Sequence, residues 1–318
     1  MMSNRCHICY QILNTKDDYH HACLKKLFNS IDPIIVDFKE NDIEKLAYEY
    51  VSQKMALPGV QKKLSISLVK SEENEYRFNR LTIVGYLGGE YILKPPAKEF
   101  PFMPEIEDLT MHLASIAKIN VALHGLIKMS NGKLAYFTKR FDRVNKRKIA
   151  VEDFCQLSNK FTEDKYKSSS ERVGQLIRNY SSVPGDDCLK FFELILFCFI
   201  VGNADMHLKN FSLITQDLNN IRLAPNYDLL STRLLIPKHQ DPEELALPLN
   251  GKKSNIKRKD FEAFGRNLQI PDKVIHNSIS LMTENWDNWK KMIDNSFLNN
   301  ELRNQFQELI QERIAKLA

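Results

Sequence analysis

The stretch GNADMHLKNFS, residues 202–212, is the most informative segment of this 318-residue chain. It follows the most apolar run of the sequence, which predicts a buried helix, and it leads into a predicted hairpin. Asp205 and Asn210 stand five positions apart in it, and Asp228 comes after the hairpin in the turn PNYDLLS. Kinases orient the attacking hydroxyl with such an Asp, and they bind Mg²⁺ with such an Asn and a second Asp. The sequence therefore predicts a phosphoryl-transfer centre.

Each of these residues alone has a plainer interpretation, because a single Asp or Asn near a strand end usually forms a cap or a turn. Two upstream features favour the kinase interpretation. Lys94 ends the apolar strand 90–94, and Glu107, with Glu105 as second candidate, begins the helix that follows. A kinase needs such a lysine to hold the α- and β-phosphates of ATP, fixed by a carboxylate on that helix. Taken singly, a solvated lysine and a helix-start glutamate favoured by the helix dipole would explain both.

The phosphate-binding loop is the weakest element of the pattern. The sequence contains neither a Gly-x-Gly-x-x-Gly nor a Walker motif. The stretch LPGVQKKL, residues 57–64, is the one loop of suitable kind, with one glycine and two lysines before a strand. By itself this stretch is a weak indication.

Hydrophobic periodicity divides the chain into three parts. Residues 1–55 form a Cys/His segment with a helix, residues 56–138 a strand-rich N-lobe, and residues 139–318 a helical C-lobe. The predicted fold class is α+β: a two-lobed, protein-kinase-like fold with a small antiparallel-sheet N-lobe and a larger helical C-lobe. The expected strands are 64–69, 90–94, 123–129, 133–139, 210–215 and 221–224, with Asn131-Gly132 as one hairpin turn. The expected helices are 43–51, 105–119, 151–158, 169–180, 187–202, 259–267, 272–295 and 299–316.

Composition is that of an ordinary globular protein, with 43% hydrophobic and 27% charged residues. A net charge of +5 is only mildly basic, so it does not favour direct binding of nucleic acid. The most apolar run is far shorter than the roughly 20 residues that span a bilayer, and the polar N-terminus does not fit a secretory signal. We therefore expect a cytoplasmic protein without direct membrane contact, whose cysteines are reduced or bind metal.

The N-terminus carries a second constellation of chemically active residues. Cys6-x-x-Cys9 is followed by His20 and Cys23, with His21 also available. Three thiolates and one imidazole suit tetrahedral zinc, in a closed and therefore structural site. The alternative is that the cysteines are small buried residues and the histidines are surface polar groups. The cluster is remote in sequence from every phosphate-handling residue, so kinase activity should not require added zinc.

Six motifs, in this order along the chain, resemble the HipA family of bacterial toxin kinases. They are PGVQKK (58–63), YILKP (91–95), KRFDR (139–143), EDFCQ (152–156), GNADMHLKNFS (202–212) and YDLL (227–230). The resemblance covers most of the chain from about residue 55 to about residue 270. It implies an ATP- and Mg²⁺-dependent serine/threonine kinase.

Carried over position by position, the resemblance implies a role for each candidate residue. Asp205 is the catalytic base, His207 braces the catalytic loop, and Asn210 and Asp228 bind Mg²⁺. The residues implied to bind ATP are Gly59, Val60, Gln61 and Lys63 in the phosphate loop, Lys94 with Glu107 at the phosphates, and the strand around Phe137, whose backbone would contact adenine. In the N-terminal cluster, the similar family pattern favours His20 as the zinc ligand.

The chain departs from HipA in two ways. HipA carries a further segment before the kinase core, whereas here the core begins near residue 55, which looks like the shorter HipT form. Ala56-Leu57 stands where HipA has a regulatory serine, and Ser65 and Ser67 resemble instead the paired autophosphorylation serines of HipT. From the strand pattern alone, both serines are solvent-facing residues that alternate with Leu64 and Ile66.

The family implies a toxin of a toxin–antitoxin system that phosphorylates a translation-related protein, an aminoacyl-tRNA synthetase and in the HipT form the tryptophanyl enzyme. The implied partners are a helix-turn-helix DNA-binding antitoxin and a small protein that supplies the missing N-terminal subdomain. DNA would then be contacted only indirectly. The alternative is a non-catalytic nucleotide-binding module of a DNA-bound repressor complex, in which the zinc cluster and the basic bias serve assembly.

Overall fold

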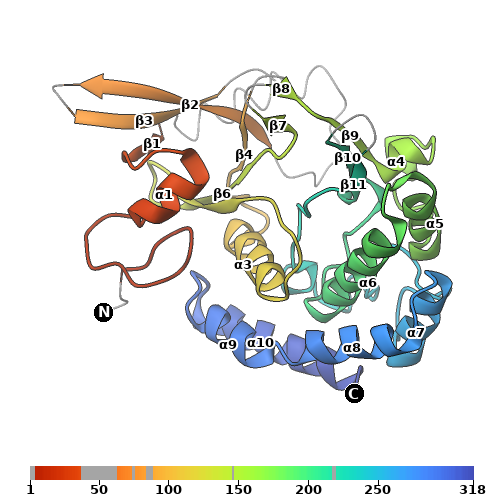
Figure 1. The fold of residues 1–318 in the computed structure, drawn as a ribbon. Helices are drawn as coiled ribbons and strands as arrows, with labels where there is room; N and C mark the ends of the chain where they lie inside the picture. The colour runs from red at the N-terminus through yellow and green to blue at the C-terminus, as the bar shows by residue number, and fades with distance from the viewer. Residues whose placement is uncertain (1–3, 37–62, 74–75, 84–88, 145–146, 217–219) are drawn as a thin grey trace. The chain divides into compact units, whose positions relative to one another are not determined.

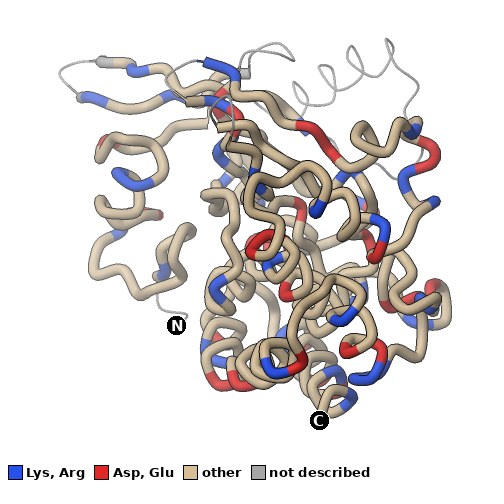
Figure 2. The backbone as a smooth tube through the Cα atoms, turned by 45° about the vertical axis from the view of Figure 1, so that its right-hand side comes forward, with Lys and Arg blue, Asp and Glu red and all other residues tan. Residues whose placement is uncertain are grey.

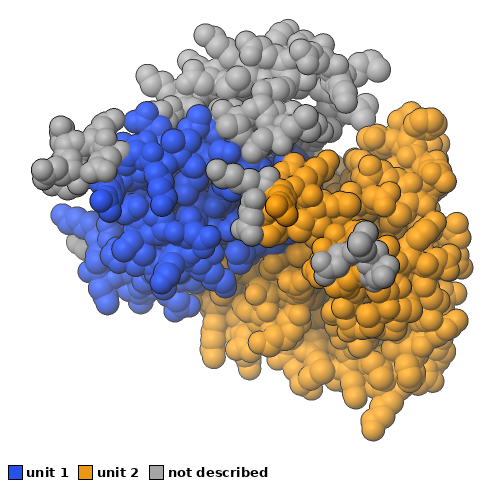
Figure 3. All heavy atoms as spheres, turned by 45° about the horizontal axis from the view of Figure 1, so that its top comes forward, with its two compact units in different colours: residues 1–108, 122–141 blue, residues 109–121, 142–318 orange. Residues whose placement is uncertain are grey.

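The computed structural model describes residues 4–36, 63–73, 76–83, 89–144, 147–216 and 220–318. The chain divides into two compact units (Figure 3). Unit 1 comprises residues 1–108 and 122–141, and unit 2 comprises residues 109–121 and 142–318. The helix expected at 43–51 and the Gly59–Gln61 turn lie outside the described residues.

Unit 1 is built on a six-stranded sheet with the strand order β1-β3-β2-β4-β6-β5 (Figure 1). Neighbouring strands are antiparallel except for the parallel pair of β1 and β3. Gly132, at φ +81°, turns the chain between β5 and β6, which agrees with the expected Asn-Gly hairpin. The strands are β1 Ile34–Val36, β2 Leu64–Glu73, β3 Tyr76–Ile83, β4 Tyr91–Lys94, β5 His124–Lys128 and β6 Leu134–Lys139. Strands β1 and β3 were not expected from the sequence.

The apolar face of this sheet shares its core with the N-terminal Cys/His segment. Along β2, Leu64 and Ile66 are buried, as period-2 alternation requires. Helix α1, His21–Phe28, lies against the same face, and the Phe28 ring stacks on Phe137 with 5.3 Å between centroids. Residues before the kinase core therefore take part in folding the sheet.

Helix α3, Met103–Ile116, begins in unit 1 and ends in unit 2. It starts two residues before the expected position and ends where Lys118 adopts a left-handed conformation, at φ +64°. Ile106, Leu109 and Leu113 are fully buried, which is the periodicity on which the expectation rested.

Unit 2 is mostly helical, with a small sheet in the order β11-β10-β9. Its central helix α6 is buried from Phe191 to Ile200 except at Glu193, which agrees with the apolar run of the sequence. The helices are α4 Phe154–Leu157, α5 Ser170–Tyr180, α6 Pro184–Ile200, α7 Arg258–Asn267, α8 Asp272–Thr283, α9 Trp286–Asp294 and α10 Asn300–Ala315. The strands are β7 Arg143–Val144, β8 Arg147–Lys148, β9 Ala150–Asp153, β10 Ser212–Thr215 and β11 Ile221–Leu223. None of the helices in the described parts of the chain is long and apolar enough to cross a membrane.

Three expected elements of unit 2 were wrong in detail. The helix expected at 151–158 begins only at Phe154, because residues 150–153 pair with β10 and Asp153 forms a capping box with Gln156. The helix expected at 272–295 is two helices, separated at residues 284–285 without a Gly or Pro signal. The strand expected from Asn210 starts at Ser212, since residues 208–210 form a 3₁₀ turn.

Candidate active site

The loop between α6 and β10 carries the predicted catalytic residues of unit 2. It leaves the helix through Gly202, at φ +68°, where an added Cβ would come within 2.8 Å of the Arg233 side chain. Only glycine fits this turn. The Thr232 hydroxyl accepts a hydrogen bond from the Ala204 amide (2.9 Å) and donates one to the Gly202 carbonyl (3.2 Å). These contacts fix the backbone just before Asp205.

Asp205 presents a half-exposed carboxylate, with half of its side-chain surface accessible. Its backbone amide donates to the buried Asn203 side chain (3.1 Å), and its Oδ1 accepts a hydrogen bond from the Tyr166 hydroxyl (2.5 Å). The Asn210 amide nitrogen donates to the Asp205 carbonyl at 2.9 Å. Because that bond uses Nδ2, the Asn210 side chain can offer a metal only its Oδ1.

His207 is buried beside Asp205, with 3.9 Å between its Nε2 and the carboxylate oxygen Oδ1. The Tyr166 ring packs edge-on against it, at 5.0 Å between centroids. Burial lowers the pKa of His207, although the charge of Asp205 acts in the opposite direction. The imidazole is therefore neutral near pH 7 and packs between the Tyr166 ring and the Asp205 carboxylate.

Asp228 adopts a left-handed backbone conformation, at φ +56°, which Asp and Asn tolerate better than other non-glycine residues. The preceding Tyr227 joins it to the catalytic loop. The Tyr227 hydroxyl donates to the Lys209 carbonyl (3.0 Å) and lies 2.5 Å from the Ser212 hydroxyl. The Lys209 ammonium in turn pairs with Asp153 on β9 at 2.9 Å. The backbones that carry Asn210 and Asp228 are thus tied together within unit 2.

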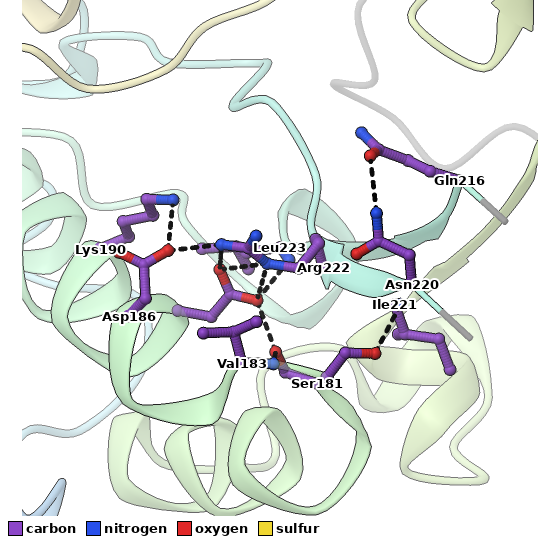
Figure 4. Close-up of polar contacts among 11 residues, drawn as sticks. Ser181, Val183, Asp186, Lys190, Gln216, Asn220, Ile221, Arg222 and Leu223 are labelled. Carbon is purple, nitrogen blue, oxygen red and sulfur yellow. Dashed lines mark hydrogen bonds and ion pairs between the residues drawn. The ribbon is translucent and has the colours of Figure 1, made fainter.

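The hairpin β10–β11, which connects Asn210 to Asp228, is anchored to α6 by the buried Asp187 carboxylate. Figure 4 shows the Arg222 side chain of β11 beside Asp186 of the same helix. Asp187 accepts hydrogen bonds from the Arg222 guanidinium, from the Leu223 amide (3.0 Å) and from the Ser181 hydroxyl (2.6 Å). Its neighbour Asp186 also pairs with Arg222 but is 44% exposed.

Asp187→Ala is therefore expected to lower the free energy of unfolding by about 2–4 kcal/mol, because it leaves several donors without their charged partner. Asp186→Ala is the matched control, since it removes a half-exposed partner of the same arginine and should cost less than about 1 kcal/mol. Urea unfolding of both variants measures the difference. Equal losses of unfolding free energy would show that the buried Asp187 stabilises the protein no more than the exposed Asp186.

Unit 1 contains the predicted phosphate-binding lysine and its carboxylate partner. Lys94, at the end of β4, forms an ion pair with Glu107 on α3, and both side chains are almost completely buried. The Lys94 ammonium also lies 5.3 Å from the centre of the Tyr136 ring. Between the two candidate glutamates, the ion pair forms with Glu107.

Glu105 lies one half-turn earlier on α3 and behaves differently. Burial raises the pKa of Glu105 to about 7. A hydrogen bond to its own backbone amide acts in the opposite direction, and the nearby Asp108 charge adds a smaller increase. Because this folded-state pKa lies above the ordinary value of 4.5, the folded protein binds more protons than the unfolded chain between the two values. The stability of the protein is thus expected to fall as pH rises through this range.

Glu105→Gln removes that titration, so the variant should lose less stability than the wild type between about pH 5 and about pH 8. Urea unfolding of both proteins at the two pH values measures the difference in slope. Parallel pH profiles would contradict the raised pKa.

The family model for the HipA-like C-terminal domain matches residues 55–289, more than half of the chain. The chain belongs to this family. Two curated relatives from Sinorhizobium fredii bear the names "Putative kinase Y4dM" and "Putative kinase Y4mE". The first is 29% identical over 235 residues, which cover 70% of this chain and 56% of the relative. The second is 34% identical over 188 residues, which cover 56% of this chain and 43% of the relative. The chain thus spans about half the length of these relatives.

Two solved structures share the fold of this HipA-like chain. The HipA chain of a Shewanella oneidensis HipA, HipB and operator DNA complex superposes with a TM-score of 0.67 at 19% identity, over 86% of this chain and 70% of that one. The Helicobacter pylori proinflammatory kinase CtkA superposes with a TM-score of 0.54 at 18% identity, over 80% and 93%. At these identities the likeness establishes the fold, and it agrees with the predicted two-lobed kinase-like class.

Two other predicted ATP-binding residues of the HipA-like core, Lys63 and Phe137, lie next to β2 and in β6. Lys63 is exposed directly before β2, whereas Gly59, Val60 and Gln61 lie outside the described residues. The Phe137 ring is fully buried, and its backbone belongs to β6, which is flanked by β4 and β5. The Phe137 side chain therefore belongs to the core.

Ser65 and Ser67 point to the face of β2 opposite the core, and both are partly exposed. The Ser65 hydroxyl accepts a hydrogen bond from the Gly89 amide at 3.0 Å. A Cβ at position 89 would come within 2.3 Å of that oxygen, so the close approach requires glycine. Ser67 lies opposite Thr82 of β3.

The four predicted zinc ligands come together within unit 1. One side-chain donor atom from each of Cys6, Cys9, His20 and Cys23 lies within 4.8 Å of the others. The pKa of the Cys6 thiol is lowered, chiefly because Cys23 and Cys9 donate hydrogen bonds to its sulfur. His21 is exposed at the start of α1 and does not join them.

Sequence reasoning missed two residues of the site. Tyr166 lies in a polar stretch before α5, and nothing in that local pattern indicates its bond to Asp205. Asp108 is completely buried and holds both Tyr10 and His124. The available signal for Asp108 was a second carboxylate directly after Glu107 in the expected helix, since a buried carboxylate is usually paired.

Proposed function

We propose that this chain is an ATP- and Mg²⁺-dependent serine/threonine protein kinase. The observation that carries the proposal is the buried ion pair of Lys94 and Glu107. Such a pair is a poor source of stability, because desolvation offsets the attraction between the charges. A lysine braced by a helix carboxylate is instead what kinases use to hold the α- and β-phosphates. Membership of the HipA-like family and the names of the relatives support the same activity.

The donor atoms of unit 2 fit Mg²⁺, which prefers carboxylate and amide oxygens. Asn210 would contribute Oδ1, since its nitrogen is used by the Asp205 carbonyl, and Asp228 would contribute its carboxylate. When bound, the ion would neutralise charge on the β- and γ-phosphates. The Asp205 carboxylate would orient the acceptor hydroxyl and take its proton, while neutral His207 braces the loop.

Tyr166 gives this proposal a further element. Its hydroxyl donates to Asp205 Oδ1, as an acceptor serine or threonine hydroxyl would donate to the catalytic base. The pKa of Tyr166 is raised by burial and by this bond, so the phenol remains a donor near pH 7. A protein substrate must therefore use the other carboxylate oxygen or displace the tyrosine.

For adenine we propose backbone contacts at the end of β6, beyond Lys139, instead of at Phe137, because the backbone of Phe137 lies between two strands. Lys63 and the turn of Gly59, Val60 and Gln61 remain the proposed phosphate loop. The position of Lys63 directly before β2 supports this, since β2 pairs with β4, the strand that ends in Lys94.

Autophosphorylation of Ser65 or Ser67 is a further proposal for the same site. Both serines lie in β2, so the first residues of that strand must leave the sheet before either hydroxyl reaches ATP. A phosphate would add about −1.5 to −2 charges beside Lys63 and the strand that ends in Lys94, in competition with ATP. Self-modification would thus restrain the kinase.

We propose that the kinase is the toxin of a toxin–antitoxin system. The structure of the Shewanella oneidensis relative contains HipB and operator DNA, which supports a DNA-binding antitoxin as partner. A small protein that supplies an N-terminal subdomain would be a second partner, and the substrate would be an aminoacyl-tRNA synthetase, tryptophanyl in the HipT form. Along the described backbone Lys and Arg are interspersed with Asp and Glu (Figure 2), in keeping with indirect contact with DNA.

We also propose that Cys6, Cys9, His20 and Cys23 hold one structural zinc ion. Atoms about 2.0–2.3 Å from one tetrahedral ion lie about 3.3–3.8 Å apart. The Cys9 Sγ and His20 Nδ1 atoms are 3.3 Å apart, which fits such a site. The other ring nitrogen of His20 lies 3.2 Å from the Ile12 carbonyl, an arrangement that presents Nδ1 to a metal.

Incubation with labelled ATP and Mg²⁺, followed by phosphopeptide mapping, tests the kinase proposal on the protein itself and on added tryptophanyl-tRNA synthetase. Wild type should transfer phosphate to serine or threonine, and Asp205→Asn should lose transfer by at least about 10²-fold. Folded wild type that binds ATP without transfer would support the non-catalytic repressor module. Equal phosphate transfer by wild type and by Asp205→Asn would show that Asp205 has no part in the mechanism.

A further inference from the structure

Residues 4–28, the first described part of the Cys/His segment, are fixed to the edge strand β5 of the sheet in unit 1. The Leu126 amide donates to the His7 carbonyl (2.9 Å), and the Tyr19 hydroxyl donates to the Leu126 carbonyl (3.1 Å). Leu24 and Leu27 of this segment are buried in the hydrophobic core of the sheet. The segment therefore has a defined position relative to the strands that carry Lys94 and His124.

The ligand-bearing turn of this segment is ordered by its own hydrogen bonds. The Tyr10 amide donates to the Cys6 carbonyl and the Cys6 amide to the Gln11 carbonyl, both at 2.9 Å. The His20 amide donates to the Cys6 sulfur at 3.4 Å. Tyr10 follows the second cysteine at φ +62°, and this left-handed turn directs its side chain into the interior, where it is completely buried.

The Tyr10 hydroxyl bonds a carboxylate of α3. It donates to Asp108 Oδ2 at 2.7 Å, across 98 positions of sequence, while His124 Nδ1 lies 2.6 Å from Oδ1 of the same carboxylate. Asp108 directly follows Glu107, and adjacent helical residues project about 100° apart. The first turns of α3 are therefore held from two directions, by Lys94 at Glu107 and by Tyr10 with His124 at Asp108.

We propose that Tyr10 is a positioning residue through which the zinc-bound Cys/His segment fixes α3, and with it the Lys94–Glu107 pair that holds ATP. Zinc bound to the four ligands fixes the turn from which Tyr10 projects. The Tyr10 hydroxyl then bonds Asp108, and Asp108 is part of the helix that carries Glu107. Metal loading thereby controls nucleotide affinity without contact between metal and nucleotide. The last step rests on the proposed kinase function; the metal and helix steps do not.

Metal content is the first measurement. Purified wild type should contain about one zinc per chain, and Cys6→Ser and Cys23→Ser should lower that content. Cobalt-substituted protein should show the thiolate-to-metal charge-transfer absorption of a tetrahedral site. Reduced wild type that binds neither zinc nor cobalt would overturn the metal step.

Hydrogen exchange of residues 103–116 tests the clamp in a variant that keeps every ligand. Tyr10→Phe should retain zinc but accelerate exchange in the first turns of α3 by about tenfold, as expected for the loss of a buried hydrogen bond to a charged group. Tyr19→Phe is the matched control: it also loses a buried hydroxyl of the same segment, but one bonded to β5. Zinc removal from wild type should reproduce the effect of Tyr10→Phe, and zinc addition should reverse it.

Steady-state kinetics tests the link to ATP. Tyr10→Phe and zinc-depleted wild type should raise the KM for ATP by about threefold or more, with kcat changed less, while Tyr19→Phe stays near wild type. Equal α3 exchange in the two tyrosine variants would overturn the clamp. Altered exchange with an unchanged KM would overturn the link to nucleotide. Wild type without any ATP binding or transfer would instead refute the kinase proposal and leave the metal and exchange results standing.

Discussion

Asp228→Asn is expected to lower phosphoryl transfer by at least about 10²-fold while the protein remains folded. The substitution replaces a carboxylate that would bind Mg²⁺ with a neutral amide. Asn tolerates the left-handed backbone at this position, so the loss should come from charge. Mg²⁺-dependent nucleotide affinity should fall together with activity. Calorimetric titration with Mg·ATP and a phosphoryl-transfer assay measure both quantities.

Asp205→Asn is the matched comparison for this variant. It should lose comparable activity but largely keep its nucleotide affinity, because Asp205 would act on the acceptor hydroxyl and not on the metal. Asp228→Ala should behave like Asp228→Asn but lose about 1 kcal/mol more stability, since alanine is less favourable at positive φ. Folded Asp228→Asn with more than about a tenth of wild-type transfer would contradict the assigned role.

Lys94→Met should have the second large effect, on both stability and activity. It leaves the Glu107 carboxylate buried without its ammonium partner, and breaking a buried ion pair in this way costs about 3–5 kcal/mol. It also removes the proposed contact to the α- and β-phosphates, so ATP affinity and transfer should fall together. Denaturant unfolding and nucleotide titration are the measurements.

A double variant separates the two effects of Lys94. In Lys94→Met/Glu107→Leu both charges are gone, so most of the lost stability should return, because apolar replacement of a buried pair is often neutral. ATP binding and transfer should remain lost. Recovery of activity in the double variant would show that the pair is structural only, and full stability of Lys94→Met alone would show that the pair is not strongly coupled.

The candidate catalytic residues and much of the element order follow from local patterns in the sequence. Spacing within residues 202–212, the period-2 alternation of β2 and the Asn131-Gly132 turn are all local patterns. Side-chain periodicity and turn chemistry act over a few residues, so they can be read without the fold. The same locality explains the errors at residues 151–153, whose extended conformation follows from pairing with β10.

Only the tertiary structure decided which of these residues meet. Lys94 pairs with Glu107 and not with Glu105, because the two positions face different directions on one helix. Tyr166 bonds Asp205 across 39 positions, and Tyr10 bonds Asp108 across 98. The Cys/His segment is remote in sequence from the proposed phosphate-binding residues, yet its Tyr10 bonds the helix that carries Glu107. Packing of elements distant along the chain sets such contacts, and no local pattern encodes them.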